Sequence, residues 1–108
     1  MTWLLRDGDV LAAAEVADSF AGRTRGLLGR STVEGALILP RTRSVHTVGM
    51  HFPIDVAFCD REMRVVGVAT MRPWRLSRPR RGCRSVIEAR AGAFERWGLR
   101  VGDQLELR

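Results

Sequence analysis

Short apolar runs separated by turns rich in glycine, proline and aspartate divide this chain into many small elements. The run Arg64–Met71 (RVVGVATM) has the β-branched residues typical of a strand. Asp7-Gly8 lies between two further apolar runs and predicts a hairpin turn, because glycine tolerates a positive φ. This alternation of short apolar runs and turns predicts a β-rich fold.

Seven or eight short strands and two short helices follow from the pattern. The strands are expected at 2–6, 10–16, 45–48, 54–59, 64–71, 85–88 and at the end of 99–107, with a further apolar burst at 35–39. One helix is expected after an Asp18 or Ser19 N-cap, ending near Leu28, and a second over 91–97, stopped by Gly98. We therefore expect an α+β fold, with residues 1–108 as one compact β-rich domain whose curled antiparallel or mixed sheet is barrel-like.

The composition is that of an ordinary globular protein. Of 108 residues, 45% are hydrophobic and 28% charged, which excludes a disordered or collagen-like chain. No apolar run is long enough to span a membrane, and charged residues interrupt the N-terminal segment, so we expect no membrane association and a cytoplasmic location. Cys59 and Cys83 lack any metal-type spacing and are expected to be free thiols.

Positive charge is concentrated in one segment. The chain has 18 basic residues and 12 acidic ones, for a net charge of +6, and every basic residue is arginine. Residues 72–84 carry six of these arginines and no acid, so the rest of the chain is neutral. Residues 23–43 are also locally positive, and the two stretches would form one anion-attracting surface if they lay side by side.

Two carboxylates fall within apolar strand patterns. Asp55 and Glu88 should each be paired with a cation or with backbone donors, because burying an unpaired carboxylate costs several kcal/mol. Arg25 and Arg30 are candidate cations, and an Asp55–Arg pair would fix the first helix to the sheet. A functional carboxylate is the alternative at both positions.

His46, Met50 and His51 could suggest a metal site. The spacing supplies no closed set of ligands, so we expect no metal and no cofactor. His46 is expected either to be a hydrogen-bonded structural residue or to couple to Asp55 as a general base. Cys83 lies among arginines, which would lower its pKa and make it the more reactive thiol.

The 72–84 segment reads as a long surface loop, a kind of segment that often carries function. Trp74 beside Arg72 and Arg75 could stack on a base, but no nucleic-acid-binding motif accompanies it, so nucleic acid is an unlikely partner. A solvated loop and an anionic ligand or acidic partner remain open.

Four segments resemble one family: RTRGLLGR at 23–30, HTVGMHFPIDVAF at 46–58, SVIEARAG at 85–92 and GLRVGDQL at 98–105. They are similar to the domain of unknown function 192 family, also called the uncharacterised UPF0127 family. The resemblance implies a compact β-rich α+β domain and no assigned activity. Other members have an aromatic-Met-Lys/Arg-Asn run at 49–52, so no role of that Lys or Asn carries over to this chain.

Two functional hypotheses follow. The first is a binding module for an anionic or polar small molecule or partner, in which the 72–84 loop folds back over the 46–53 turn. Its candidate ligand-binding residues are Arg25, Arg30, His46, Met50, Phe52, Trp74, Arg78, Arg80 and Arg81. The alternative is a small hydrolase or lyase in which His46, Asp55 and Glu88 act as acid and base.

Overall fold

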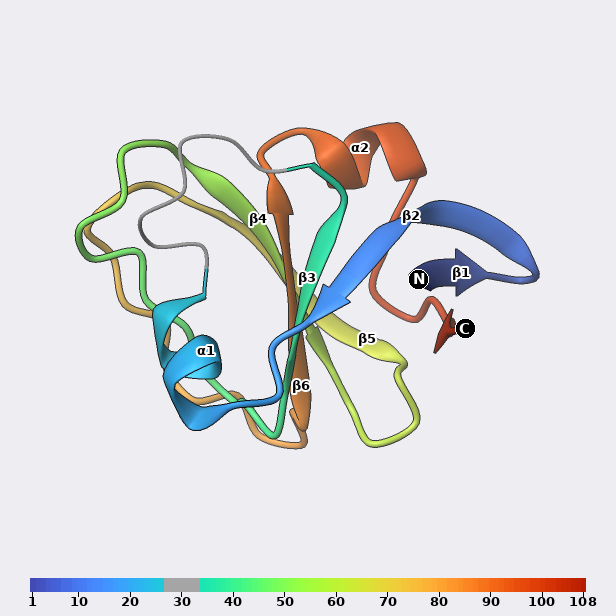
Figure 1. Cartoon of the computed structure of the whole chain (residues 1–108), viewed down its shortest axis with the longest axis horizontal. Helices are drawn as coiled ribbons and strands as arrows, with labels where there is room; N and C mark the ends of the chain where they lie inside the picture. The colour runs from blue at the N-terminus through green and yellow to red at the C-terminus, as the bar shows by residue number, and fades with distance from the viewer. Residues whose placement is uncertain (27–33) are drawn as a thin grey trace.

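A computed structural model describes residues 1–26 and 34–108, without the side chains of Phe20, Thr24 and Arg25. In this part of the chain seven strands and two short helices are present (Figure 1), which confirms the α+β prediction. The elements are β1 Thr2–Arg6, β2 Asp9–Val16, α1 Phe20–Arg25, β3 Ala36–Pro40, β4 Ile54–Cys59, β5 Val65–Met71, β6 Ser85–Arg90, α2 Ala93–Trp97 and β7 Leu105–Leu107. None of the helices in the described residues is long and apolar enough to cross a membrane.

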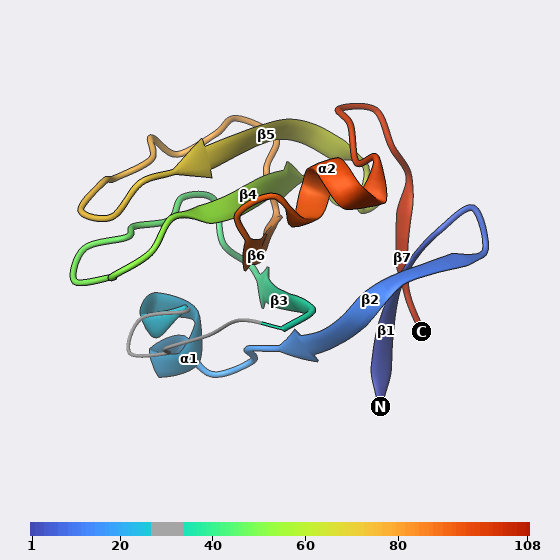
Figure 2. The ribbon, with the colours of Figure 1, turned by 90° about the horizontal axis from the view of Figure 1, so that it is seen from above.

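The seven strands form one mixed sheet in the order β5-β4-β6-β3-β2-β1-β7. Only β2 and β3 pair in parallel. The sheet curls into a half-barrel, and Figure 2 shows β1, β2 and β7 turned away from β4 and β5. The two edges meet at one end, where the Val65 amide donates to the Asp103 carbonyl over 2.9 Å and the Leu105 amide donates to the Met63 carbonyl over 3.0 Å. This contact covers part of the exposed edge of β5.

Hydrophobic residues cover both faces of the central strands. All six residues of β4 are buried, because one face packs under α2 and the other faces α1 and the 72–84 loop. Side chains alternate between the faces along a strand, so Ala57 and Ile87 join the cluster that contains Phe94, while Val56 and Val86 join the opposite one. Side chains at odd and even positions of β4 and β6 therefore serve different sites.

Several local predictions are confirmed. Asp7 and Gly8 have φ values of 52° and 82° in the predicted hairpin turn. The Ser19 side chain accepts a hydrogen bond from the Gly22 amide over 2.9 Å and caps α1. Gly98 ends α2 with a φ of 64°.

One predicted strand and one predicted helix end are wrong. The segment 45–48 is not a strand: it makes one isolated bridge, between His46 and Leu76, because its neighbour is the irregular 72–84 loop. Helix α1 ends at Arg25, earlier than predicted, where Gly26 follows with a φ of 53°. Leu28 lies outside the described residues.

Candidate functional site

The 72–84 loop is held against the segment 43–47. The Thr47 amide donates to the Arg75 carbonyl over 2.8 Å, and the Ser77 amide donates to the Val45 carbonyl over 2.9 Å. The buried Thr47 hydroxyl donates to the Arg72 carbonyl over 2.6 Å. The loop therefore lies beside His46, as the sequence predicted, and its backbone is anchored at several points.

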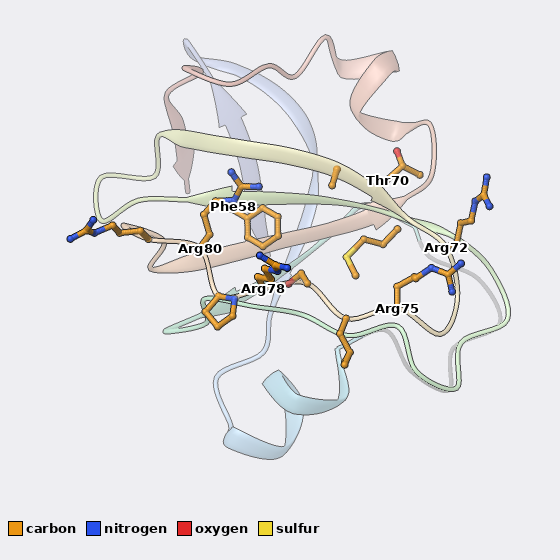
Figure 3. Close-up of a pocket in the computed structure, with 12 residues that line it drawn as sticks. Phe58, Thr70, Arg72, Arg75, Arg78 and Arg80 are labelled. Carbon is orange, nitrogen blue, oxygen red and sulfur yellow. The ribbon is translucent and has the colours of Figure 1, made fainter.

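The loop and the sheet border an open cavity of about 680 Å³, which we call the arginine cavity (Figure 3). Five arginines border it, and the described lining contains no acidic residue. The full lining is Phe58, Ala69, Thr70, Met71, Arg72, Arg75, Leu76, Ser77, Arg78, Pro79, Arg80 and Arg81. The volume lies within the usual range for small-molecule sites, roughly 300 to 1,000 Å³.

Arg80 is positioned by the strands beneath it. Its guanidinium carbon lies 4.7 Å from the centre of the Phe58 ring, within range of a cation–π contact. Gly67 is the register partner of Phe58, and a Cβ added there would lie 2.5 Å from that same guanidinium carbon. Glycine in this strand therefore makes room for the arginine. Figure 3 shows Phe58 between Arg78 and Arg80, with Arg72 and Arg75 at the other end of the cavity.

No ion pair within the described residues neutralises the five arginines of this cavity. Among those residues, ion pairs join Arg6 to Asp103 and Arg108 to Glu106, each at 3.1 Å, and neither involves the loop. Arg75 donates to the neutral carbonyl of Trp74 over 3.4 Å. Several cations with no carboxylate among them create a positive potential in the cavity.

A second cavity, of about 440 Å³, lies on the other side of Leu76 and Ser77, which border both. We call it the Glu88 cavity. Its lining is Arg23, Gly26, Arg41, Thr42, Arg43, Ser44, Val45, His46, Leu76, Ser77 and Glu88. The positive stretch 23–43 and the 72–84 loop are thus neighbours, which the sequence left open.

Glu88 and His46 are brought together in this cavity's wall. Glu88 is 2% exposed. A Cβ added to Gly26 would lie 2.8 Å from the Glu88 Oε1 atom, so only glycine lets the chain pass so close to this carboxylate. His46 Nδ1 accepts a hydrogen bond from the Val48 amide over 3.3 Å.

Asp55 lies on the opposite face of the sheet, which corrects two predictions. Its Oδ1 accepts from the Thr70 hydroxyl over 2.8 Å, and its Oδ2 accepts from the amides of Gly92 and Phe94 over 3.0 and 3.1 Å. Asp55 therefore holds the start of α2, and these partners replace the expected Asp–Arg pair with the first helix. It also cannot couple to His46, so an acid–base set of His46, Asp55 and Glu88 does not form.

The other predicted site residues are dispersed. Met50 is buried in the core and Phe52 packs against it. Trp74 is 65% exposed, at a φ of 64°, and does not line the arginine cavity. His51 is exposed, apart from Met50. The Arg25 side chain and all of Arg30 lie outside the described part of the chain.

The prediction that nearby arginines lower the pKa of Cys83 is wrong. Cys83 is buried, and burial raises its pKa despite the opposing effect of the nearby Arg80 and Arg43 charges. Burial also raises the pKa of Cys59 to about 12, with smaller contributions from Cys83 and Asp60. Both cysteines are free and protonated at neutral pH, so neither is a nucleophile.

Sequence reasoning missed part of the arginine cavity. Arg72 and Arg75 belong to the charged run but were not among the named ligand-binding residues, and Phe58 reads as a core residue. A glycine within the most strand-like run was a usable signal, because such a glycine often marks close approach of another group.

The half-barrel and its two basic cavities define a small α+β protein with a candidate anion site. Residues 3–107 match the family described as DUF192, Uncharacterized ACR, COG1430. The chain is 38% identical over 97 residues to the UPF0127 protein of Pyrococcus abyssi, covering 85% of this chain and 83% of that protein. It is also 38% identical over 96 residues to the UPF0127 protein of Pyrococcus horikoshii, covering 84% of each. The chain belongs to the DUF192 family, as its four motifs indicated.

Two solved structures have the same fold. One is a protein of unknown function from Novosphingobium aromaticivorans DSM 12444, with a TM-score of 0.79 and 20% identity, covering 97% of this chain and 82% of that one. The other, from Sinorhizobium meliloti 1021, has a TM-score of 0.81 and 22% identity, covering 97% of this chain and 90% of that one. These similarities concern the fold alone.

Proposed function

We propose that this protein is a binding module for an anionic small molecule and that the arginine cavity is its site. The observation that carries the proposal is that five arginines border one cavity without an acidic residue among them. Guanidinium groups donate charge-assisted, often bidentate, hydrogen bonds to carboxylates and phosphates. A bound anion would supply the counter-charge that the described residues do not.

The cavity wall also suggests the shape of the ligand. Phe58 and Met71 add apolar side chains to the lining. Arg78 and Arg80 flank Phe58, while Arg72 and Arg75 lie at the other end, so two anionic groups can be held at once (Figure 3). We propose an elongated ligand with an anionic group at each end.

Anion retention tests the proposal. Replacing Arg78, Arg80 and Arg81 with serine should abolish retention on a heparin column, and the affinity for inorganic pyrophosphate should fall by at least about tenfold, because each charge-assisted hydrogen bond is worth about 1.5 to 3 kcal/mol. A matched control replaces Arg61, Arg90 and Arg100, which are exposed and outside the arginine cavity. The control should keep the pyrophosphate affinity. Equal losses in both triple variants would show that net charge alone is responsible and would overturn the proposal.

We also propose that the protein works in the cytoplasm. Cys59 and Cys83 are free and buried, and a reducing compartment keeps such thiols unoxidised.

A further inference from the structure

Two cations converge on one neutral oxygen at the Glu88 cavity. Arg23 Nη1 donates to the backbone carbonyl of Asp18 over 2.5 Å, and Arg41 Nη2 donates to the same oxygen over 3.3 Å. Both arginines line the cavity. Their guanidinium groups are therefore neighbours, although one comes from α1 and the other follows β3.

This arrangement holds two guanidinium groups side by side, and their shared partner is a neutral carbonyl rather than a carboxylate. Neither Arg23 nor Arg41 forms an ion pair in the described part of the chain, and Arg43 adds a third cation to the same lining. Two like charges held close repel each other, and a carbonyl dipole offsets this only in part. An oxyanion placed between them would remove the repulsion and accept hydrogen bonds from both.

The same cavity also contains a hydrogen-bond acceptor, a carboxylate, which a bare anion would not contact because the two charges repel. Glu88 lines the cavity with its carboxylate against Gly26. A carboxylate has about four lone-pair sites, so it can accept a further hydrogen bond in addition to its present contacts. Glu88 would repel a bare anion but would accept a bond from a hydroxyl or ammonium group on the ligand.

We propose that the Glu88 cavity is a second binding site, for a small oxyanion that also carries a hydrogen-bond donor. Arg23 and Arg41 bind the anionic group, and Glu88 accepts from the donor. The ligand class is hydroxy acids and amino acids. This site is separated from the arginine cavity by Leu76 and Ser77 and does not depend on anion binding there.

Two probes that differ by one hydroxyl test this selectivity. Succinate and malate are titrated separately into 15N-labelled protein, with backbone amide shifts as the readout. Malate should bind more tightly than succinate by about tenfold, the value of one hydrogen bond to a charged acceptor, and should shift the amides of Gly26, Thr42 and Ser44. Shifts confined to Ala69, Arg78 and Arg80 would instead place both probes in the arginine cavity and would overturn this inference while supporting the proposed function.

Variants test separately the arginines that bind the anionic group and the carboxylate that accepts from the donor. Arg23→Gln with Arg41→Gln should weaken both probes by at least about tenfold, whereas the control pair Arg61→Gln with Arg90→Gln should weaken neither. Glu88→Gln should lower malate affinity toward that of succinate. Since Glu88 is buried, its variant is interpreted only if its amide spectrum remains dispersed; otherwise the arginine pair decides. Equal malate and succinate affinities in the natural protein, or an unaffected arginine pair, would overturn the proposal.

Discussion

Asp55 and the arginines of the 72–84 loop are charged groups in opposite situations. Asp55 is 4% exposed, and its oxygens accept three hydrogen bonds from Thr70, Gly92 and Phe94. The loop arginines border an open cavity, and within the described residues no carboxylate pairs with them. A charged group whose hydrogen bonds are all made within the protein supports the fold, whereas charged groups held together without counter-ions are available to a ligand.

The largest effect is expected at Asp55. Asp55→Ala should lower the free energy of unfolding by about 3 kcal/mol, because two buried amides and a hydroxyl lose their acceptor. Urea denaturation measures the change. Asp55→Asn retains one acceptor oxygen and should lose less. If Asp55→Ala unfolds at the same urea concentration as the natural protein, Asp55 is not a structural group and the contrast with the arginines fails.

Cys59, like Asp55, is a buried group that supports the fold. We expect its thiol to make the stability of the protein depend on pH in the alkaline range. Its pKa is raised from 9.0 to about 12 by burial, so its stabilising contribution is complete below pH 9. As the pH rises from 9 toward 12, the unfolded chain releases this thiol proton while the folded protein keeps it, and stability falls. Denaturation at several pH values should therefore show a steeper loss above pH 9 in the natural protein than in Cys59→Ala. Identical slopes would contradict this assignment.

Gly67→Ala tests whether the position of Arg80 over Phe58 matters for anion binding. The added methyl group would meet the Arg80 guanidinium at 2.5 Å and displace it from Phe58. Stability should change by no more than about 1 kcal/mol, because the arginine side chain can move away. Pyrophosphate affinity should fall by about threefold, the value of a weak cation–π contact. In an Arg80→Ser background the same substitution should leave affinity unchanged, and an undiminished loss there would show that Arg80 is not the group displaced.

The smallest effect is expected at Trp74, which is 65% exposed. Trp74→Ala should change the free energy of unfolding by less than about 0.5 kcal/mol, as is usual for surface substitutions. Its predicted contact with a ligand would be at the rim of the cavity, so pyrophosphate affinity should fall by less than about twofold, a change of under 1 kcal/mol. Urea denaturation measures the free energy of unfolding and calorimetric titration measures the affinity, each against the natural protein. A tenfold loss would move the centre of the site to Trp74.

The sequence predicted local features better than the meeting of distant segments. The Asp7-Gly8 turn, the Ser19 cap and the Gly98 stop depend on neighbouring residues and were predicted correctly. The partners of Asp55 are 15 to 39 residues away, on β5 and at the start of α2, and two of them are backbone amides. No residue type marks such donors in advance, so arginine was the natural but incorrect choice.

The candidate site shows the same limit. The charge run indicated the 72–84 loop, which borders the arginine cavity, because arginines without nearby acids can be counted in a sequence. The burial of Met50 and Cys83 could not be predicted, since it depends on how the loop pairs with the segment 43–47. The separation of Asp55 from Glu88 followed from their faces in the sheet, which the strand register determines.

The most direct measurement is a titration of inorganic pyrophosphate into 15N-labelled protein, followed by amide shifts. We expect saturable shifts at Phe58, at Gly67–Met71 and at Ser77, Arg78, Arg80 and Arg81, with the amides of Gly92 and Phe94 unchanged because they bond to Asp55. Shifts that do not saturate, or that spread over exposed arginines such as Arg61 and Arg100, would contradict a specific anion site in the arginine cavity.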